Sequence, residues 1–362
     1  MFTDEIKKAI DCCISHNIPF AVYSFPGEND IFFFANPSAS EENKAHFDER
    51  TEFIVSFFNN DYPYTVGIKP EMTAVELLQI AATLETKASP EISPWTRDTE
   101  YLQYCSQAHQ IINDLKRVGG KTVLSRVITG KITRKCSDVI EEYFNANIEA
   151  FCYSYMTQET GCWLGATPEI LYEHKLGNSY FETMSLAGTR LSSMHNYPWD
   201  YKNIEEHNYV TEYISSTLLN LGYDVYVGNE ETIQYGTIEH LCHRINAKIN
   251  NGKTVDLLNR LSPTPAVAGY PLEYALDDIM HYEAHPRYCY AGYVGIADKK
   301  GLHIYVNLRC AHFNSERFCI YGGGGLTELS IEEDEWQEVE LKTAVLRRIL
   351  TETNNVSHGN NR

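Results

Sequence analysis

Two acidic segments carry glutamates at spacings that suit a hard metal ion. Glu205 and Glu206 lie in KNIEEHNYVTEYI, and Glu335 and Glu338 lie in EEDEWQEVELK. Both segments have helical patterning, and residues three apart share one face of a helix, so the second pair projects from one side. Carboxylates from two facing helices would form an all-oxygen site suited to Mg²⁺. Two solvated helix faces with ordinary charge pairs would explain the same residues.

Two further positions combine an ionisable group with apolar surroundings. Lys121 begins the apolar segment KTVLSRVITG directly after Gly119 and Gly120, so it could be desolvated enough to act as a general base. Glu169 follows Pro168 in a turn between apolar segments, where burial would favour the protonated form and a role as general acid. A lysine at a strand end and a glutamate in a turn are the structural alternatives.

The sequence also contains groups that can bind an anion. Arg309 stands in IYVNLRC, a predicted strand, and a guanidinium there can form two hydrogen bonds with a carboxylate. The four glycines at 322–325 follow another predicted strand, and a glycine-rich turn lets backbone N–H groups approach an anion closely. A tight turn explains the glycines equally well.

Two segments resemble metal sites but lack the required spacing. HYEAH at 281–285 has two histidines four apart, but its glutamate is one position away from the metalloprotease arrangement and Pro286 follows at once. EHLCH at 239–243 has no second ligand group at the expected spacing. We therefore expect no zinc site in either segment.

Charge and composition limit the partners and the compartment. The chain has 49 acidic and 30 basic residues, and its net charge of −19 argues against a nucleic acid or an anionic membrane as partner. Charged residues interrupt the N-terminal segment, and no later apolar run is long enough to span a bilayer, so we expect a cytoplasmic protein. The ten cysteines include no CxxC pair, which predicts reduced cysteines in the core.

The elements that must position these groups alternate irregularly along the chain. Helical spacing predicts helices over 3–16, 74–87, 99–116, 136–146 and 201–220. Strands are predicted at PFAVYSF, DIFFFAN, YTVGI, TVLSRVITG, EAFCYSYM and within GCWLGATPEILYEHK. This mixed order indicates an α+β fold, and the polar tail at 353–362 is predicted to be disordered.

The motifs occur in an order that resembles the chorismate-utilising enzymes, which include isochorismate, salicylate, anthranilate and aminodeoxychorismate synthases. The resemblance covers roughly residues 95–350 and implies one large domain of mainly antiparallel sheets with outer helices. Residues 1–95 would be a variable N-terminal part of that domain and 96–352 the chorismate-binding catalytic region. The segments that carry the resemblance are GGKTVLSR, LGATPEILYE, SLAGTR, KNIEEHNYV, IEHL, SPTPAVAGYP, YAGYVG, NLRCA, GGGGL and EWQEVELK.

The resemblance also implies roles for individual residues. Lys121 matches the base that activates water for attack at C2 of chorismate, and Glu169 matches the acid that protonates the departing C4 hydroxyl. Glu206 and Glu338 match ligands of Mg²⁺, with Glu335 as a water-mediated partner. The substrate contacts implied by the resemblance are Gly188, Thr189, His240, Ala266, Tyr290, Arg309, Gly323 and Lys342.

Two positions distinguish members of the family, and a third departs from its usual pattern. Ala187 stands where aminodeoxychorismate synthases place a lysine nucleophile, so covalent capture at C2 is not available. Ala266 stands where anthranilate and salicylate synthases usually carry threonine and isochorismate synthases carry alanine. Asn203 replaces a carboxylate of many relatives, which weakens the outer metal shell. The resemblance therefore favours isochorismate synthase, an isomerase of the hydroxymutase type.

The sequence leaves several alternatives open. A salicylate synthase would also eliminate pyruvate from isochorismate, and an anthranilate synthase component would use ammonia from a glutamine amidotransferase, which is not fused to this chain and which we do not expect as an obligatory partner. A catalytically inactive relative would only bind chorismate. Isochorismate feeds menaquinone or catecholate siderophores, and the N-terminal region is more similar to the menaquinone branch.

Overall fold

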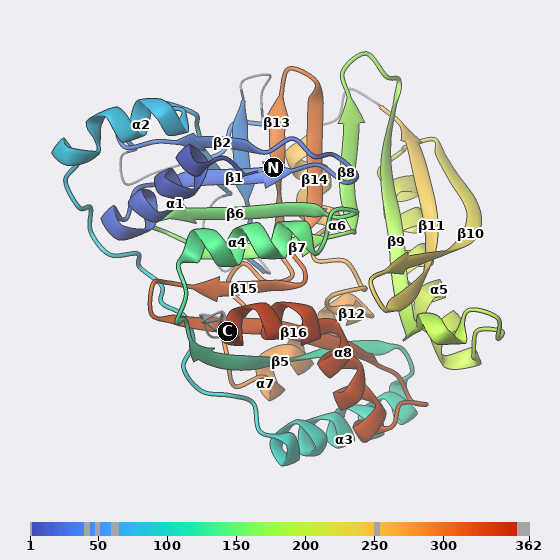
Figure 1. Ribbon diagram of the computed structural model, residues 1–362. Coiled ribbons are helices and arrows are strands. Elements are labelled where there is room, and N and C mark those ends of the chain that lie inside the picture. Colours follow the sequence, from blue (N-terminus) through green and yellow to red (C-terminus); the bar gives the residue numbers. More distant parts are fainter. Residues whose placement is uncertain (1, 40–43, 48–50, 59–64, 250–253, 353–362) are drawn as a thin grey trace, which may run out of the picture.

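The computed structural model describes residues 2–39, 44–47, 51–58, 65–249 and 254–352, so the tail predicted to be disordered lies outside the described residues. Two large sheets form the centre, and the strands of one run across the picture in Figure 1 while those of the other run up and down behind and to the right of them. Every strand pair among the described residues is antiparallel, which confirms the predicted α+β class.

Each sheet has eight strands. In spatial order the first sheet contains β12 (Gly269–Tyr270), β5 (Lys121–Lys131), β16 (Arg317–Leu326), β15 (Cys310–Phe313), β7 (Gly161–Thr167), β6 (Phe151–Thr157), β1 (Phe20–Ser24) and β2 (Phe32–Ala35). The second contains β10 (Val225–Tyr235), β11 (Ile238–Lys248), β9 (Tyr180–Leu191), β8 (Ile170–Lys175), β14 (Gly301–Val306), β13 (Tyr293–Asp298), β3 (Glu52–Val55) and β4 (Val66–Ile68).

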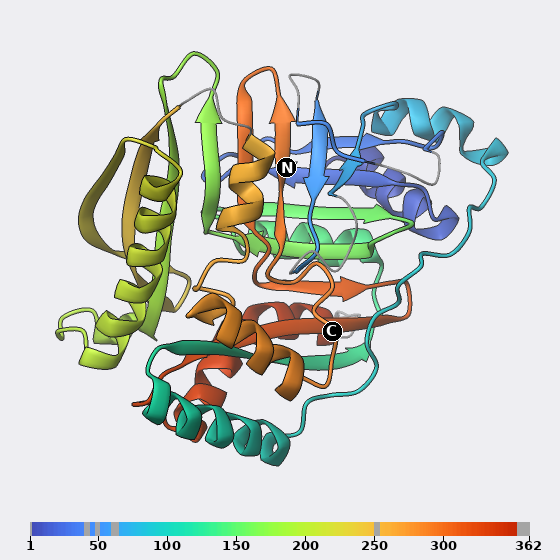
Figure 2. The same cartoon turned by 180° about the vertical axis from the view of Figure 1, so that it is seen from behind.

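Helices cover the outer faces of both sheets. In Figure 1 α1 (Asp4–His16), α2 (Ala74–Ile80), α4 (Cys136–Asn145) and α8 (Glu332–Thr351) lie in front of the first sheet, and α3 (Tyr101–Val118) lies beneath it. In the reverse view of Figure 2, α5 (Tyr201–Asn220), α6 (Thr254–Leu261) and α7 (Leu272–Tyr282) are in front. Two short 3₁₀ turns, Ala81–Thr83 and Ser192–Met194, complete the described helices.

The first sheet is buried on both faces, as strand β1 illustrates. Ala21 and Tyr23 point into the core between the sheets, whereas Phe20 and Val22 point into a second core under the helices. Successive side chains of a strand alternate between faces, so an uninterrupted apolar run such as FAVY fits a strand that is covered on both sides. The stacking of Phe151 on Tyr305, with ring centroids 4.4 Å apart, joins the two sheets.

Several sequence predictions of local structure are confirmed, and three are wrong. The helix predicted at 74–87 ends at Ile80, because Ala81–Thr83 has no buried residue to hold a further helical turn. Glycines 322–325 lie inside β16, not in a turn after a strand. Arg309 lies just before β15 with φ of +47°, outside any strand.

The ten cysteines are all free, and all but Cys12 and Cys105 are buried, as predicted. Their thiols therefore pack as small apolar groups. No helix in the described parts of the chain combines the length and the apolar character that a membrane crossing requires.

Candidate active site

A cavity lies between the two sheets, where β5 and β16 of the first face β9 and β11 of the second. Together with its open mouth it encloses about 700 Å³. Helices α5 and α8 close its sides with Glu206 and Lys342. The predicted site residues on its wall are Glu169, Gly188, Thr189, Glu206, His240, Ala266, Tyr290, Arg309, Gly323 and Lys342.

Lys121 lies behind this wall and reaches the cavity through Glu206. Its side chain is fully buried at the start of β5, and its Nζ forms an ion pair of 3.0 Å with Glu206 Oε1. Burial alone would raise the pKa of Glu206, but Lys121 and Lys202 outweigh burial and lower it. Glu206 is therefore an ionised carboxylate held between two lysines, and it connects the predicted base with the predicted metal ligands.

Glu169 occupies the turn between β7 and β8, and it has the environment that a general acid requires. Its carboxyl is buried, and Oε1 has no hydrogen-bond partner among the described residues. Burial raises the pKa of Glu169 to about 8, although Lys121 and Lys342 oppose the shift. A carboxyl with this pKa is protonated at neutral pH and can donate a proton to a leaving group.

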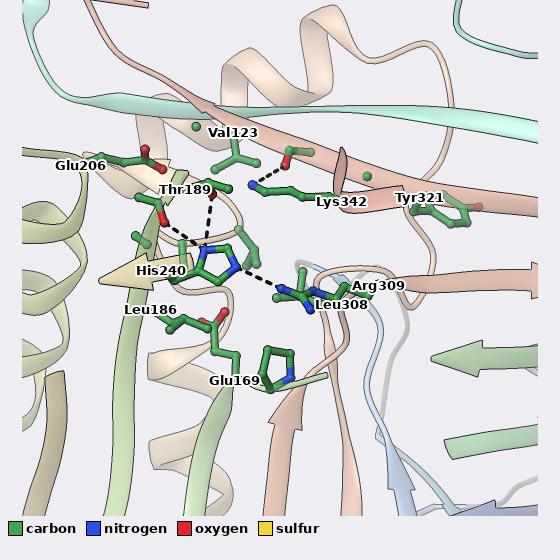
Figure 3. A pocket seen from close by; sticks show the side chains of 18 of the residues that line it. Val123, Glu169, Leu186, Thr189, Glu206, His240, Leu308, Arg309, Tyr321 and Lys342 are labelled. Carbon is green, nitrogen blue, oxygen red and sulfur yellow. Dashed lines mark hydrogen bonds between the residues drawn. The ribbon is translucent and has the colours of Figure 1, made fainter. Parts of the chain in front are cut away.

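His240 and Arg309 form a hydrogen-bonded pair in the wall of the cavity, shown in Figure 3. The His240 Nδ1–H donates to Gly188 O at 2.9 Å, so Nε2 is free to accept a hydrogen bond from Arg309 Nη2 at 3.0 Å. Burial, together with Arg309 and Lys342, lowers the pKa of His240 to about 3. A neutral His240 thus fixes the orientation of the guanidinium without adding charge, and Arg309 and Lys342 remain the cations on this side.

The predicted metal ligands occupy two adjoining spaces. Glu206 lines the cavity, whereas Glu335 and Glu338 line a neighbouring cleft, and Thr189 belongs to the walls of both. Lys202 joins the two spaces, because its Nζ lies 2.7 Å from Glu335 Oε1 and 3.7 Å from Glu206 Oε2. Burial raises the pKa of Glu335 against the effect of Lys202, and Glu338 raises it further.

These carboxylates fit a hard divalent cation. Glu335 Oε2 and Glu206 Oε2 are buried and have no hydrogen-bond partner among the described residues. Buried carboxylate oxygens without partners are costly unless a cation compensates them, and oxygen ligands are those that Mg²⁺ prefers. Asn203 does not belong to this set, since its Oδ1 accepts from Thr189 N at 2.9 Å and its Nδ2 donates to Asp200.

The four glycines of β16 make room for the site and do not form an anion-binding turn. A Cβ on Gly325 would lie 2.2 Å from Glu206 Oε1 and 2.7 Å from Lys121 Cε. A Cβ on Gly323 would lie 2.8 Å from the Tyr290 hydroxyl oxygen. The glycines therefore allow the strand to approach the charged groups closely, and Gly323 also accepts a hydrogen bond from Lys342 Nζ at 3.1 Å through its carbonyl oxygen.

The site also contains residues that are not among the predicted ones. Lys202 was detectable, because it stands four residues before Glu206 on the same helical face. The apolar part of the wall gave no signal, because its residues look like ordinary core positions. These residues are Val123, Pro168, Leu186, Val267, Leu308 and Tyr321.

The fold and the cavity define a class of α+β proteins with a charged cavity between two large antiparallel sheets. The profile of the family described as chorismate binding enzyme matches residues 69–351. This match extends over more than half of the chain, and the chain belongs to the chorismate binding enzyme family.

Curated relatives include isochorismate synthases. The chain is 27% identical to isochorismate synthase MenF of Pasteurella multocida over 72% of this chain and 64% of the relative. It is 28% identical to isochorismate synthase MenF of Haemophilus influenzae over 83% of this chain and 71% of the relative. The chain thus spans slightly less than two thirds of the Pasteurella protein.

Solved structures share the fold. The structure of MenF, the menaquinone-specific isochorismate synthase of Escherichia coli, matches with a TM-score of 0.76 and 20% identity over 96% of this chain and 91% of that one. Anthranilate synthase component I of Streptococcus pneumoniae matches with a TM-score of 0.64 and 16% identity over 91% and 90%. At these identities the likeness concerns the fold alone. The two enzymes share this fold although their names give different reactions.

Proposed function

We propose that this protein is an isochorismate synthase, a Mg²⁺-dependent isomerase that converts chorismate into isochorismate. The observation that carries the proposal is the pairing of proton donor and acceptor groups at one cavity. Glu169, with a pKa of about 8, lines the same cavity as Glu206, which is ion-paired to the buried Lys121. The curated relatives from Pasteurella and Haemophilus, both isochorismate synthases, support the choice of reaction.

The reaction needs one group to remove a proton and another to deliver one. Lys121, acting through its ion pair with Glu206, takes up a proton from a water molecule as the water oxygen bonds to C2 of chorismate. The ring double bonds shift, the C4–O bond breaks, and Glu169 delivers its proton to the departing hydroxyl, which leaves as water. One water is consumed and one is released, so the step needs neither oxidant nor reductant.

Chorismate carries two carboxylates, and the cavity offers cations for them. Arg309 and Lys342 stand on its wall, and the hydrogen bond from Arg309 to His240 holds the guanidinium in place. Two positive side chains can thus receive a carboxylate in a protein whose overall charge is −19. Ala187 and Ala266 leave the remaining wall small and without a nucleophile.

Glu206, Glu335 and Glu338 would hold Mg²⁺ in this proposal. When bound, the ion supplies positive charge for a substrate carboxylate and polarises the ring as a Lewis acid. The carboxylates themselves orient the ion from two helices, α5 and α8, and Lys202 and Lys342 balance their charge. A metal ion held in this way would explain why three buried or half-buried glutamates lie beside a site for an anionic substrate.

The wider context belongs to the same proposal. Because the Pasteurella and Haemophilus relatives carry the name MenF, and a MenF from Escherichia coli is titled menaquinone-specific, we favour menaquinone biosynthesis over siderophore biosynthesis. We propose a cytoplasmic location and no obligatory glutamine amidotransferase, since water and not ammonia is the nucleophile. No nucleic-acid or membrane partner is part of the proposal.

The test is incubation of the purified full chain with chorismate, with and without Mg²⁺, followed by chromatographic separation of the products. We expect an isochorismate peak that requires Mg²⁺. Salicylate with released pyruvate, or anthranilate formed only with added ammonia, would replace the proposed reaction by that of another family member. Unchanged chorismate that nevertheless binds to the protein would replace it by a non-catalytic binding role.

A further inference from the structure

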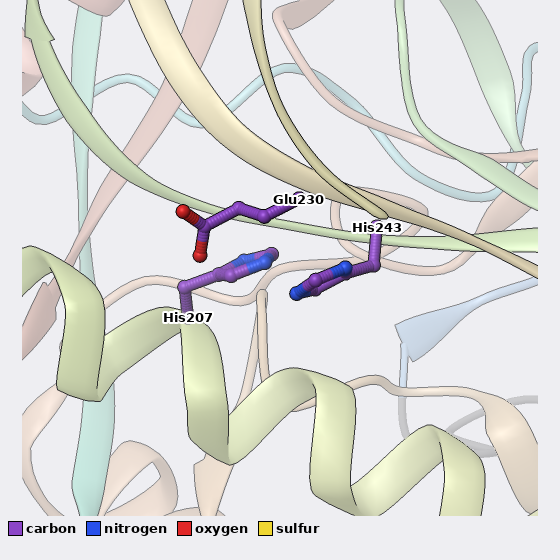
Figure 4. A group of neighbouring side chains, drawn as sticks. All are labelled: His207, Glu230 and His243. Atoms are coloured by element: carbon purple, nitrogen blue, oxygen red, sulfur yellow. The ribbon is translucent and has the colours of Figure 1, made fainter. Parts of the chain in front are cut away.

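A second group of potential metal ligands lies outside the cavity. His207 projects from α5, Glu230 from β10 and His243 from β11, and Figure 4 shows the three side chains gathered between the helix and the hairpin. One ligand atom from each residue lies within 4.8 Å of the others. We propose that these three residues form a binding site for a divalent transition-metal ion, with Zn²⁺ as the best fit.

His207 is buried without any partner for its polar atoms. It is fully excluded from solvent, and neither ring nitrogen has a hydrogen-bond partner among the described residues. An imidazole that is removed from water and left without hydrogen bonds is costly, and such groups are rare in folded proteins. A metal bond to one of its nitrogens would compensate this cost.

His243 is prepared as a ligand by its second hydrogen bond. Its Nδ1 lies 3.0 Å from the carbonyl oxygen of Gly228 and must carry the proton to make this bond. Nε2 is therefore left with its lone pair free. Metal-binding histidines commonly donate their other ring N–H to a backbone carbonyl in this way, which fixes both tautomer and ring orientation.

Glu230 is placed opposite His243 by an irregularity in the hairpin. The register of β10 on β11 shifts between Val227 and Glu230, and Glu230 is the cross-strand partner of His243. Such bulges redirect side chains. Glu230 is also exposed, so an ion could enter the cluster from solvent and keep a water molecule as its fourth ligand.

The donor set distinguishes this site from the carboxylate cluster. Two imidazoles and one carboxylate suit Zn²⁺ and related transition metals, whereas Mg²⁺ prefers oxygen ligands alone. The His207 and His243 rings now lie nearly parallel, with centroids 5.1 Å apart and an angle of 18° between them. A bound Zn²⁺ would bring the ligand atoms to about 3.3 Å from one another, given bonds of ~2.0 Å, by turning the less buried His243 and Glu230 toward His207.

The site escaped the sequence analysis because its ligands are far apart in the chain. The segment EHLCH predicted no zinc site, because no second ligand group stands at the expected spacing within the segment. The partners of His243 come from a helix and from the neighbouring strand. A bound ion would connect the β10–β11 hairpin to α5. Its ligand His207 follows Glu206 in the sequence, and its ligand His243 lies on the strand that also carries His240.

The experiment is a titration of the full chain with Zn²⁺ by calorimetry in millimolar Mg²⁺, which saturates the carboxylate cluster. Co²⁺ is used in parallel, because its visible absorption reports nitrogen ligands. We expect one Zn²⁺ per chain, and binding at least ~10-fold weaker in both Glu230→Gln and His243→Gln, since even outer contacts of a metal site change affinity by that factor. Glu231→Gln is the matched control, because neighbouring strand residues point to opposite faces, and it should bind as the unmodified protein does.

The outcomes separate this proposal from the proposed reaction. Absence of Zn²⁺ binding, or equal binding by Glu230→Gln and Glu231→Gln, would overturn the site. The exposed position of Glu230 makes Glu230→Gln safe for folding, so a failure of His243→Gln to fold would not remove the test. Because Zn²⁺ binding is measured without chorismate, its failure leaves isochorismate formation untouched, and a failure of isochorismate formation leaves Zn²⁺ binding untouched.

Discussion

The ammonium group of Lys202 forms an ion pair with Glu335, with 2.7 Å between Nζ and Oε1, in the cleft beside the cavity. The same Nζ lies 3.7 Å from Oε2 of Glu206. A lysine thus stands between carboxylates from two helices that we propose as ligands of Mg²⁺, and their fields raise the pKa of Lys202 despite its burial. The ammonium acts as the counter-ion of these carboxylates and must yield part of this role when Mg²⁺ binds.

The first prediction concerns the loss of this counter-ion in Lys202→Met. Removing one partner from a buried ion pair leaves uncompensated charge, so without Mg²⁺ the variant should be about 3–5 kcal/mol less stable. Mg²⁺ should then stabilise the variant more than the unmodified protein, as measured by thermal unfolding with and without the ion. Lys175→Met is the control, since its exposed ion pair with Glu173 spans 4.0 Å and should matter little. If Mg²⁺ stabilised Lys202→Met and the unmodified protein equally, the assignment of Glu206 and Glu335 as Mg²⁺ ligands would be contradicted.

The second prediction concerns Glu169 and pH. Its folded-state pKa of about 8 exceeds the ordinary value of 4.5, so the folded protein retains a proton that the unfolded chain releases between these limits. The contribution to stability is therefore complete below pH ~4.5 and is lost as pH rises through ~8. Turnover should likewise fall above pH ~8, where the proposed acid is ionised.

Glu169→Gln separates the two effects. The variant should lose isochorismate formation by a factor of ~10²–10⁴ while it still folds, because only the proton donor is missing. In urea unfolding at pH 9 it should be more stable than the unmodified protein by a few kcal/mol, a difference that shrinks toward pH 5. Retained turnover would remove the acid role, and a constant stability difference across this range would show that Glu169 has no raised pKa.

Sequence patterns predicted the site best where one element carries both partners. Glu338 and Lys342 are four apart on α8, a spacing that places two side chains on one helix face, and they form an ion pair of 2.7 Å. The irregular order of predicted helices and strands likewise indicated the α+β class. Order along the chain then related single residues to a family that no individual motif identified.

Sequence patterns predicted the site less well where residues meet across elements. The run of glycines in β16 predicted a turn. Glycine is needed there for another reason, because Glu206 from α5 and Lys121 from β5 leave no room for a side chain at Gly325. Lys202 contacts Glu335 across 133 positions of sequence, a relationship that no spacing rule contains. The role of Glu169 as the acid is a prediction that Glu169→Gln tests, and the role of Lys121 as the base is likewise a prediction.

The third prediction uses these glycines. In Gly325→Ala the new Cβ would lie 2.2 Å from Glu206 Oε1, so the Lys121–Glu206 ion pair must move and turnover should fall at least ~100-fold, as for other small displacements of catalytic groups. Gly324→Ala is the matched control on the neighbouring position, because its Cβ would meet Glu335 Oε2 at 3.0 Å and a small side-chain shift suffices. Similar rates for the two variants, measured with saturating Mg²⁺ and chorismate, would mean that the ion pair does not matter for the reaction.

The fourth prediction concerns Glu338, which lines the cleft and pairs with Lys342. Glu338→Gln keeps the shape of the side chain and removes one negative charge, so we expect Mg²⁺ to bind at least ~10-fold more weakly, with turnover partly recovered by excess ion. The measurement is the initial rate of isochorismate formation across a Mg²⁺ titration. Glu340→Gln, on the same helix and paired with Arg126 and Arg347, is the control and should leave the Mg²⁺ dependence unchanged. A Glu338→Gln curve that overlays that of the unmodified protein would exclude Glu338 as a ligand and leave Glu206 and Glu335 to hold the ion.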